Sequence, residues 1–199
     1  MKVDMSPKAV KERLKTMDEV SLLSVKLMNS KKIKTAKTKT MNYPITPAIR
    51  MLREKKIDFT PHVFEYVEKG GTLHSSKELG VDEHAIIKTL IFETNEKKPL
   101  IILMHGNLQV SEKNLARHLK VKSVAPATAE RANKLTGYIF GGTSPFGVKT
   151  QMPIFAEKTI FDLEKIYING GKRGFLVSIN PQVLMEVLNI EKVEIGISD

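Results

Sequence analysis

Two glycine-rich loops constrain this sequence more than any other feature. The first runs from Gly137 to Gly147 as Gly-Tyr-Ile-Phe-Gly-Gly-Thr-Ser-Pro-Phe-Gly, and the second, residues 169–174, reads Asn-Gly-Gly-Lys-Arg-Gly. Seven of the twelve glycines lie between Gly137 and Gly174. Glycines are tolerated in such number where the backbone takes positive φ or approaches a ligand closely. Freed amides in such turns favour anionic or carbonyl oxygens. The loops therefore predict a binding site, and a pair of ordinary hairpin turns remains the alternative.

The polar residues of the two loops differ in kind. Thr143 and Ser144 add two hydroxyls to the first loop, and Pro145 fixes φ so that this loop is partly pre-shaped. Lys172 and Arg173 place two cations in the second loop. Hydroxyls in one loop and cations in the other favour a ligand with oxygen atoms over two unrelated turns.

The order of these motifs resembles the YbaK family. Gly-Gly-Thr-Ser-Pro-Phe-Gly is followed by Tyr-Ile-Asn-Gly-Gly-Lys-Arg-Gly, and Lys88 lies upstream in Ile-Ile-Lys-Thr-Leu-Ile-Phe. This family consists of free-standing aminoacyl-tRNA deacylases related to the editing insertion of some bacterial prolyl-tRNA synthetases. The resemblance extends from about Ile45 to the C-terminus and leaves the first forty residues unexplained.

The resemblance implies a set of site residues. Lys88 matches the lysine most closely tied to deacylation in the family, and Gly141 and Gly142 match its catalytic loop. The implied substrate-binding residues are Phe64, Thr89, Thr143, Ser144, Pro145, Asn169, Gly170, Lys172 and Arg173.

Three positions depart from the family pattern. Phe64 stands where many members carry tyrosine, Asn169 where serine is common, and Val148 where glutamine is common. We expect these departures to bear on the choice of amino acid more than on the type of reaction.

Lys88 is also unusual when its own surroundings are considered. It interrupts Ala85-Ile-Ile-Lys-Thr-Leu-Ile-Phe92, whose other residues favour burial. Desolvating an ammonium is costly, so such a lysine is rarely fully buried. One interpretation is an edge position whose amine reaches water. The other, which the resemblance favours, is a cation at the rim of a cleft that faces a developing oxyanion. A strand here puts Lys88, Leu90 and Phe92 on one face and Thr89 and Ile91 on the other.

The sequence offers no evident protein nucleophile. It has no cysteine, its five histidines lack metal-ligand spacing, and Ser144 lies in no nucleophile elbow. We therefore predict neither a metal nor a cofactor. The resemblance implies a substrate-assisted reaction, in which a mischarged tRNA supplies an activated ester, a vicinal ribose hydroxyl and, for cysteine, a thiol.

The net charge of +10 is unevenly distributed along the chain. Residues 1–40 hold eleven basic and four acidic side chains, 11 − 4 = +7, and the other 159 residues hold 21 basic and 18 acidic ones, 21 − 18 = +3. We expect two parts: a basic extension at 1–40, with a helical segment and a linker, and an editing domain at 41–199. The extension is either dispensable or an arm that binds RNA by counterion release.

Helix and strand signals alternate irregularly along the body. This order favours an α+β domain with a strongly curved, partly closed mixed sheet flanked by short helices, as does the resemblance. The expected strands cover residues 59–67, 88–93, 100–104, 121–124, 153–156, 165–168 and 175–179. The expected helix starts are Ser6, Thr46, Ser75, Asp82, Ser111, Thr128 and Asn180.

These observations favour a trans-editing aminoacyl-tRNA deacylase, with Cys-tRNA(Pro) as the expected substrate. The expected partners are the acceptor end of a mischarged tRNA and prolyl-tRNA synthetase. A non-catalytic module that holds a tRNA or a synthetase is the alternative, and a phosphate or nucleotide binder has no fingerprint to support it. No apolar run approaches the length of a membrane span, so we expect a soluble cytoplasmic protein.

Overall fold

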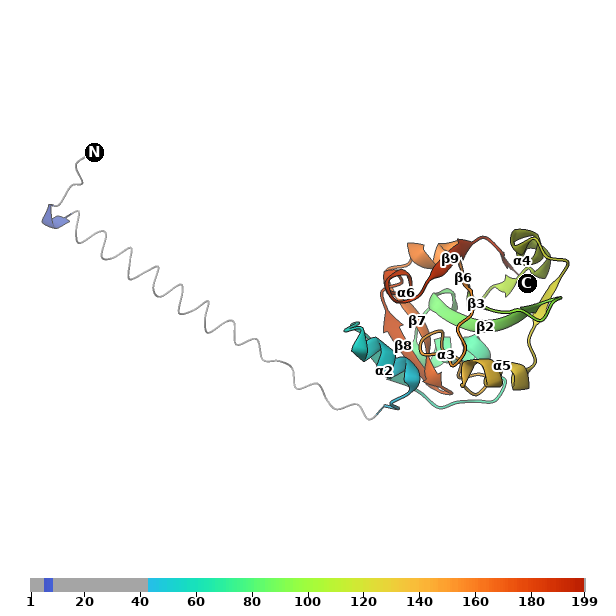
Figure 1. Ribbon diagram of the computed structural model, residues 1–199. Helices are drawn as coiled ribbons and strands as arrows, with labels where there is room; N and C mark the ends of the chain where they lie inside the picture. Colours follow the sequence, from blue (N-terminus) through green and yellow to red (C-terminus); the bar gives the residue numbers. More distant parts are fainter. Residues whose placement is uncertain (1–5, 9–42, 199) are drawn as a thin grey trace. The chain divides into compact units, whose positions relative to one another are not determined.

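The computed structural model describes residues 6–8 and 43–198 of the chain. Pro7 and Lys8 are helical, as expected from Ser6 and Pro7. The rest of the expected N-terminal helices and the basic linker lie outside the described residues. Tyr43–Asp199 forms one compact unit (Figure 1).

One mixed sheet of eight strands organises this unit. Its order is β1-β8-β7-β2-β3-β6-β9, and β5 also pairs with β2. β7 and β2, β3 and β6, and β6 and β9 are parallel pairs, and the other pairs are antiparallel. The strands are β1 (Thr60–Val63), β2 (Ile86–Thr94), β3 (Pro99–His105), β5 (Val124–Pro126), β6 (Ile154–Glu157), β7 (Ile166–Lys172), β8 (Phe175–Ile179) and β9 (Ile190–Val193). A separate pair joins β4 (Gln109–Val110) to β10 (Gly196–Ile197).

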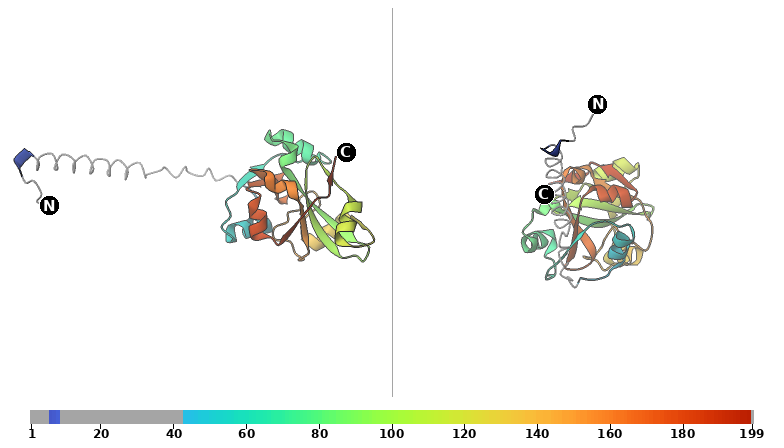
Figure 2. Two further views of the ribbon diagram at one scale, coloured as in Figure 1. Left: turned by 90° about the horizontal axis from the view of Figure 1, so that it is seen from above. Right: turned by 90° about the vertical axis from the view of Figure 1, so that its left-hand side faces the viewer.

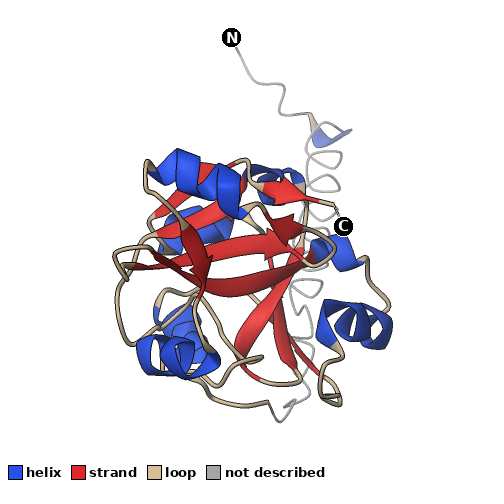
Figure 3. Cartoon of the chain, turned by 90° about the vertical axis from the view of Figure 1, so that its right-hand side faces the viewer, coloured by secondary structure: helices blue, strands red, loops and turns tan. Residues whose placement is uncertain are grey.

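Short helices flank the strands, as Figure 2 and Figure 3 show from different directions. The helices are α2 (Pro47–Glu54), α3 (Gly71–Leu79), α4 (Glu112–Leu119), α5 (Ala129–Thr136) and α6 (Gln182–Val187), with the 3₁₀ turns η1 (Glu83–Ala85) and η2 (Lys158–Asp162). Thr46, Ser111, Thr128 and Asp82 each cap the start of one of these elements by accepting a backbone N–H, which confirms four expected caps.

Both faces of the sheet are packed. Strand residues alternate between faces, so Ile101 and Leu103 of β3 belong to one hydrophobic cluster while Leu100, Ile102 and Met104 belong to another. The first cluster includes residues of α2, α5 and α6, and the second includes residues of α4. The sheet is therefore a central layer between helices, which agrees with the expected α+β class.

The central strand β2 has an interrupted edge. One edge pairs with β3 along Ile87–Glu93. On the other edge, β7 pairs only with Ile86 and Ile87, and β5 begins at Phe92. Within the described residues, β2 therefore has no strand partner between Lys88 and Ile91 on this edge. We call this stretch the β2 window.

Several details differ from the expectations. Ser75 does not start a helix: α3 begins at Gly71, where φ is +61°, and Ser75 lies within it, with its hydroxyl bonded to the Gly71 carbonyl. The strand expected over residues 59–67 ends at Val63, because its partner β8 begins at the paired residue Phe175. The ends of the sheet path, β1 and β9, do not pair in the described region, so the sheet is not fully closed there, and its expected partial closure stays a prediction.

Candidate functional site

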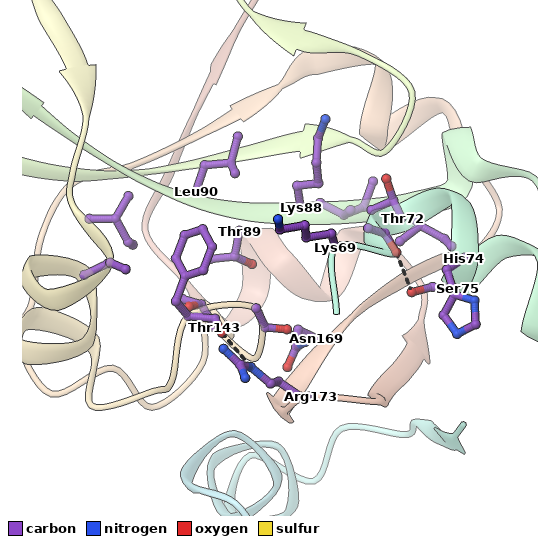
Figure 4. A pocket seen from close by; sticks show the side chains of 18 of the residues that line it. Lys69, Thr72, His74, Ser75, Lys88, Thr89, Leu90, Thr143, Asn169 and Arg173 are labelled. Atoms are coloured by element: carbon purple, nitrogen blue, oxygen red, sulfur yellow. Dashed lines mark hydrogen bonds between the residues drawn. The ribbon is translucent and has the colours of Figure 1, made fainter. Parts of the chain in front are cut away.

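A pocket of about 880 Å³ opens beside the β2 window. The four residues Lys88–Ile91 form one wall, and residues of α3, of the first glycine loop and of the β7–β8 turn form others. Figure 4 shows Thr143, Asn169 and Arg173 facing Thr89 across this space. The pocket thus lies where the sheet lacks a strand and where the two glycine loops approach it.

Thr89 presents an unused hydroxyl in this pocket. Its Oγ1 is buried and, among the described residues, has no hydrogen-bond partner. An unpartnered buried polar group costs about 1–3 kcal/mol. It lies on the face of β2 that carries Ile87 and Ile91. A bound ligand would satisfy this hydroxyl only after a small movement of the side chains that cover its oxygen, for example a rotation of Thr89 about χ1.

Lys88 lies on the opposite face of the same strand. Its ammonium donates to the carbonyls of Gly106, at 3.0 Å, and Leu108, in the turn that follows β3. Figure 4 shows its side chain pointing away from Thr143, Asn169 and Arg173. Lys88 is half-buried and lines the pocket, but the glycine loops are on the side of Thr89.

The turn whose carbonyls bind the Lys88 ammonium follows a buried histidine, His105, that fixes its position. His105 is fully buried, and its ring stacks on that of His84 with 3.6 Å between the centroids. Nδ1 donates to the His84 carbonyl at 2.6 Å, so Nε2 is the acceptor for the Thr159 hydroxyl at 2.8 Å. Burial lowers the pKa of the His105 imidazole below its ordinary value, and the nearby charge on Lys88 acts in the same direction. A neutral His105 therefore fixes the chain just before Gly106.

The two glycine loops are joined by side-chain hydrogen bonds. Arg173 Nε donates to the Phe140 carbonyl at 2.9 Å, and Asn169 Nδ2 donates to the Gly141 carbonyl at 3.3 Å. The Gly142 amide donates to the Ile139 carbonyl at 2.8 Å, which closes a turn. Gly141 has a φ of +85°, and among the described residues its amide has no partner. Of the two glycines, Gly141 is therefore the one whose amide is available to a ligand.

Gly142 allows the two glycine loops to approach each other closely. A Cβ at this position would lie 2.8 Å from the Arg173 nitrogen and 3.0 Å from the Lys172 carbonyl carbon, both of which are backbone atoms. Only glycine allows this approach without moving the chain.

The structure divides the other expected site residues into two groups. Phe64, Thr143, Asn169 and Arg173 line the pocket together with Lys88, Thr89 and Gly141. The residues that do not line it are Gly142, Ser144, Pro145, Gly170 and Lys172.

Each residue in the second group that makes a close contact has a structural reason for its place. Ser144 is fully buried and its hydroxyl accepts the Phe146 amide at 3.4 Å. Gly170 is buried against the ring of Phe175, which lies 2.5 Å from the position of a Cβ. Pro145 lines a second hollow instead.

Among the pocket residues that were not expected from the sequence, three are exposed aromatic or basic residues. Tyr66, Lys69 and Phe140 line the pocket and are exposed. The sequence contained only a weak indication that Phe140 belongs to the site. Phe140 directly precedes Gly141, and an aromatic residue beside a glycine pair has no evident packing role in a turn. Tyr66 and Lys69 follow β1 in a polar segment without a motif.

Two chemical possibilities receive no support from the described region. It contains no cluster of three His, Cys, Asp or Glu side chains that could hold a metal. None of its helices has the length and apolar character needed to cross a bilayer. The residues that line the pocket include a hydroxyl on Thr89, a backbone amide on Gly141, an ammonium on Lys88 and a guanidinium on Arg173, all of which can donate hydrogen bonds to a ligand.

These features describe a pocket in a mixed α+β fold whose lining residues include hydrogen-bond donors suited to oxygen atoms. The family model for the aminoacyl-tRNA editing domain matches residues 72–187, more than half of the chain. The chain belongs to this family.

Curated relatives and a solved structure agree with this assignment. A protein of Enterococcus faecalis named "Putative Cys-tRNA(Pro)/Cys-tRNA(Cys) deacylase EbsC" is 30% identical over 80% of this chain and 97% of its own. A proline–tRNA ligase of Streptococcus thermophilus is 30% identical over 59% of this chain, and the match spans 19% of the ligase. A structure described as "a putative trans-editing enzyme for prolyl tRNA synthetase" superposes with a TM-score of 0.67 at 17% identity, over 78% of this chain and all of that one. The last similarity concerns the fold alone.

Proposed function

We propose that this protein is a trans-editing hydrolase that cleaves the ester bond of a mischarged aminoacyl-tRNA, with Cys-tRNA(Pro) as its preferred substrate. One observation carries the proposal: Gly141 and Thr89 both line the pocket beside the β2 window, and the Gly141 amide and the Thr89 hydroxyl have no hydrogen-bond partner among the described residues. An aminoacyl ester offers a carbonyl oxygen for the amide and polar amino-acid atoms for the hydroxyl.

Hydrolysis of the aminoacyl ester requires no nucleophile from the protein, because water and the substrate supply the reacting groups. Water adds to the ester carbonyl, and the bond to the ribose oxygen breaks to give the free amino acid and tRNA. The vicinal ribose hydroxyl passes a proton to the leaving oxygen and regains one from the attacking water. The Gly141 amide stabilises the oxyanion, and holding these groups together contributes several kcal/mol, roughly, through proximity alone.

Lys88 contributes positive charge from the other side of β2. Its ammonium is held by the Gly106 and Leu108 carbonyls, within the wall of the pocket. A fixed cation in a partly dry site favours the oxyanion even without direct contact. The neutral His105 supports this geometry because it precedes Gly106 and holds the turn.

The apolar part of the pocket supports a small, uncharged amino acid. Ile87, Ile91 and Leu176 line it, and burying a charged side chain against them would be costly. Cysteine satisfies this condition, and the name of the Enterococcus faecalis relative agrees with it.

The test is hydrolysis of a panel of charged tRNAs by the purified protein. We expect Cys-tRNA(Pro) to be cleaved faster than Pro-tRNA(Pro), and we expect a chelator to leave the rate unchanged. Complete loss of activity in the chelator, with recovery on adding zinc, would contradict the mechanism.

A second candidate is a non-catalytic module that holds a tRNA or a synthetase. The charge of the body suits a protein that acts together with a partner such as a synthetase, because residues 41–199 carry only 21 − 18 = +3, which gives little affinity for RNA unaided. Tight binding of charged tRNA without release of amino acid would favour this candidate over the hydrolase.

A further inference from the structure

Phe140 is an exposed aromatic residue with a fixed backbone. Its side chain is 56% exposed and lines the pocket, so it stands at the rim. Its amide donates to Asn133 Oδ1 at 2.7 Å, and its carbonyl accepts from Arg173 Nε at 2.9 Å. The amide and the carbonyl of Phe140 are therefore both hydrogen-bonded, although its ring is exposed to solvent. An aromatic ring at the mouth of a pocket is in position to stack on a ligand that enters the pocket.

Arg173 and Tyr66 form a second flat surface on the same rim. The guanidinium carbon lies 5.1 Å from the centroid of the Tyr66 ring, and both residues line the pocket. No acidic side chain of the described region forms an ion pair with Arg173. Lys69, also exposed, adds another cation to the lining. The rim thus combines aromatic rings with two cations that form no close ion pair among the described residues, although Glu68 and Glu112 also line the pocket.

This combination fits unpaired nucleotides better than an apolar peptide. Bases of single-stranded RNA stack on aromatic rings and on guanidinium planes, and their phosphates attract nearby cations. A protein helix would instead require a continuous apolar stripe. If the ester occupies the pocket, the nucleotides before the terminal adenosine must cross the rim.

We infer that Phe140 and the Arg173–Tyr66 pair form a stacking platform for the unpaired nucleotides that precede the terminal adenosine of the tRNA. This inference rests on the proposed function, which places the aminoacyl ester in the pocket. The platform supplies affinity for the RNA and takes no part in bond cleavage.

The direct test is binding of labelled single-stranded oligoribonucleotides that end in CCA, followed by fluorescence anisotropy. A matched oligonucleotide carries an abasic sugar in place of the cytidine before the terminal adenosine, which keeps the phosphates but removes one base. The full-length protein should bind the intact oligonucleotide roughly fivefold or more tightly, the effect of one stacked base. Phe140→Ala and Phe140→Leu should both remove this difference, because neither side chain stacks.

Ile139→Ala is the control variant. Ile139 is the neighbouring residue, is 66% exposed, and does not line the pocket, so its truncation should preserve the discrimination. In hydrolysis of charged tRNA, Phe140→Ala should raise KM by a similar factor and leave kcat unchanged.

The outcomes separate the two proposals. Equal binding of both oligonucleotides by the parent protein would overturn the platform, even if hydrolysis proceeds. The same holds if Ile139→Ala loses discrimination as Phe140→Ala does, or if Phe140→Ala weakens association with prolyl-tRNA synthetase and not with RNA. If the parent protein discriminates but does not hydrolyse any charged tRNA, the platform stands and the hydrolase proposal fails.

Discussion

Lys88 and Thr89 are adjacent in β2, but their side chains lie on opposite faces of the sheet. The Lys88 ammonium contacts the carbonyls of Gly106 and Leu108, whereas the Thr89 hydroxyl faces the pocket with Thr143 (Figure 4). The β2 window allows both arrangements, because no strand covers this edge in the described residues. We therefore expect Thr89 to be the nearer of the two to a ligand on the side of the glycine loops, and Lys88 to act on that ligand through the wall of the pocket.

Thr89→Val should separate stability from activity. Valine has nearly the same shape but lacks the unpartnered hydroxyl, so the free energy of unfolding should stay equal or rise by about 1 kcal/mol. Hydrolysis should fall about tenfold if the hydroxyl binds the substrate. Denaturant unfolding and single-turnover rates measure the two effects.

Thr94→Val on the same strand is the matched control. The Thr94 hydroxyl accepts the amides of Glu96 and Lys98, so its loss should destabilise the protein by about 1–2 kcal/mol and spare hydrolysis. Equal losses of stability in both variants would mean that the Thr89 hydroxyl has a partner in solution.

Removing the charge of Lys88 should reduce hydrolysis roughly a hundredfold, the usual effect of one preorganised charge. We expect this of Lys88→Ala and of Lys88→Met, which keeps most of the apolar stem, with little change in Tm. Lys88→Arg should rescue poorly, because a planar guanidinium does not fit two carbonyls of one tight turn as an ammonium does.

Lys98→Ala, in the exposed β2–β3 turn, is the control for the loss of a charge at Lys88. Rates within about twofold of the parent for Lys88→Ala would remove Lys88 from the catalytic site.

Gly142→Ala should separate the two glycine loops. The added methyl group would overlap backbone atoms of Lys172 and Arg173, so we expect a loss of about 1–3 kcal/mol in stability and of most activity. Gly80→Ala is a useful comparison. Gly80 has a φ of +63° and open space around it, so that variant tests backbone strain alone and should retain its specific activity. Normal activity of Gly142→Ala would show that the loops need not touch.

His105 should make stability depend on pH in a predictable direction. Burial lowers the pKa of the folded imidazole, whereas an unfolded histidine takes up a proton as pH falls through about 6.5. The unfolded state then binds more protons, so the free energy of unfolding is fully retained above about pH 6.5 and decreases as pH falls below it.

The variant His105→Gln should flatten this dependence below about pH 6.5. Some slope should remain, because burial, aided by the charge on Lys165, also lowers the pKa of His62. An unchanged slope in chemical denaturation would exclude His105 as its source.

Removing residues 1–40 tests the role of the basic extension. If these residues are dispensable, a protein that starts at Met41 should fold and hydrolyse its substrate as the full chain does. If they bind RNA, the loss of 11 − 4 = 7 net positive charges should weaken tRNA binding and flatten its dependence on salt. Binding that is unchanged across several salt concentrations would rule out the arm.

Local signals in the sequence predicted local structure well. Thr46, Ser111 and Thr128 cap helices where expected, because a capping hydrogen bond spans only three residues. The strand β9 was not predicted: Ile-Glu-Lys-Val is short, and its stability comes from parallel pairing with β6, far away in the sequence. The expected strong curvature of the sheet stays a prediction.

The site was predictable only in part, because it also depends on contacts between segments that are far apart in the sequence. The glycine motifs indicated a binding site, and alternation along β2 correctly separated Lys88 from Thr89. The β2 window, however, arises because two strands from distant segments, β7 and β5, stop short of each other. No local pattern encodes that gap, so the exposed rim formed by Tyr66 and Phe140 could not be placed beside it.

The β2 window also affects how this protein avoids unwanted association. An exposed strand edge normally invites pairing with an edge from another chain, which leads to aggregation. Among the described residues, only Lys88–Ile91 lack a strand partner on this edge, and β7 and β5 pair with β2 on either side of that stretch. A foreign strand would have to enter between them and displace the Ala127 amide from the Ile91 carbonyl. The chain can thus keep backbone groups open for a small ligand without offering a template for a fibril.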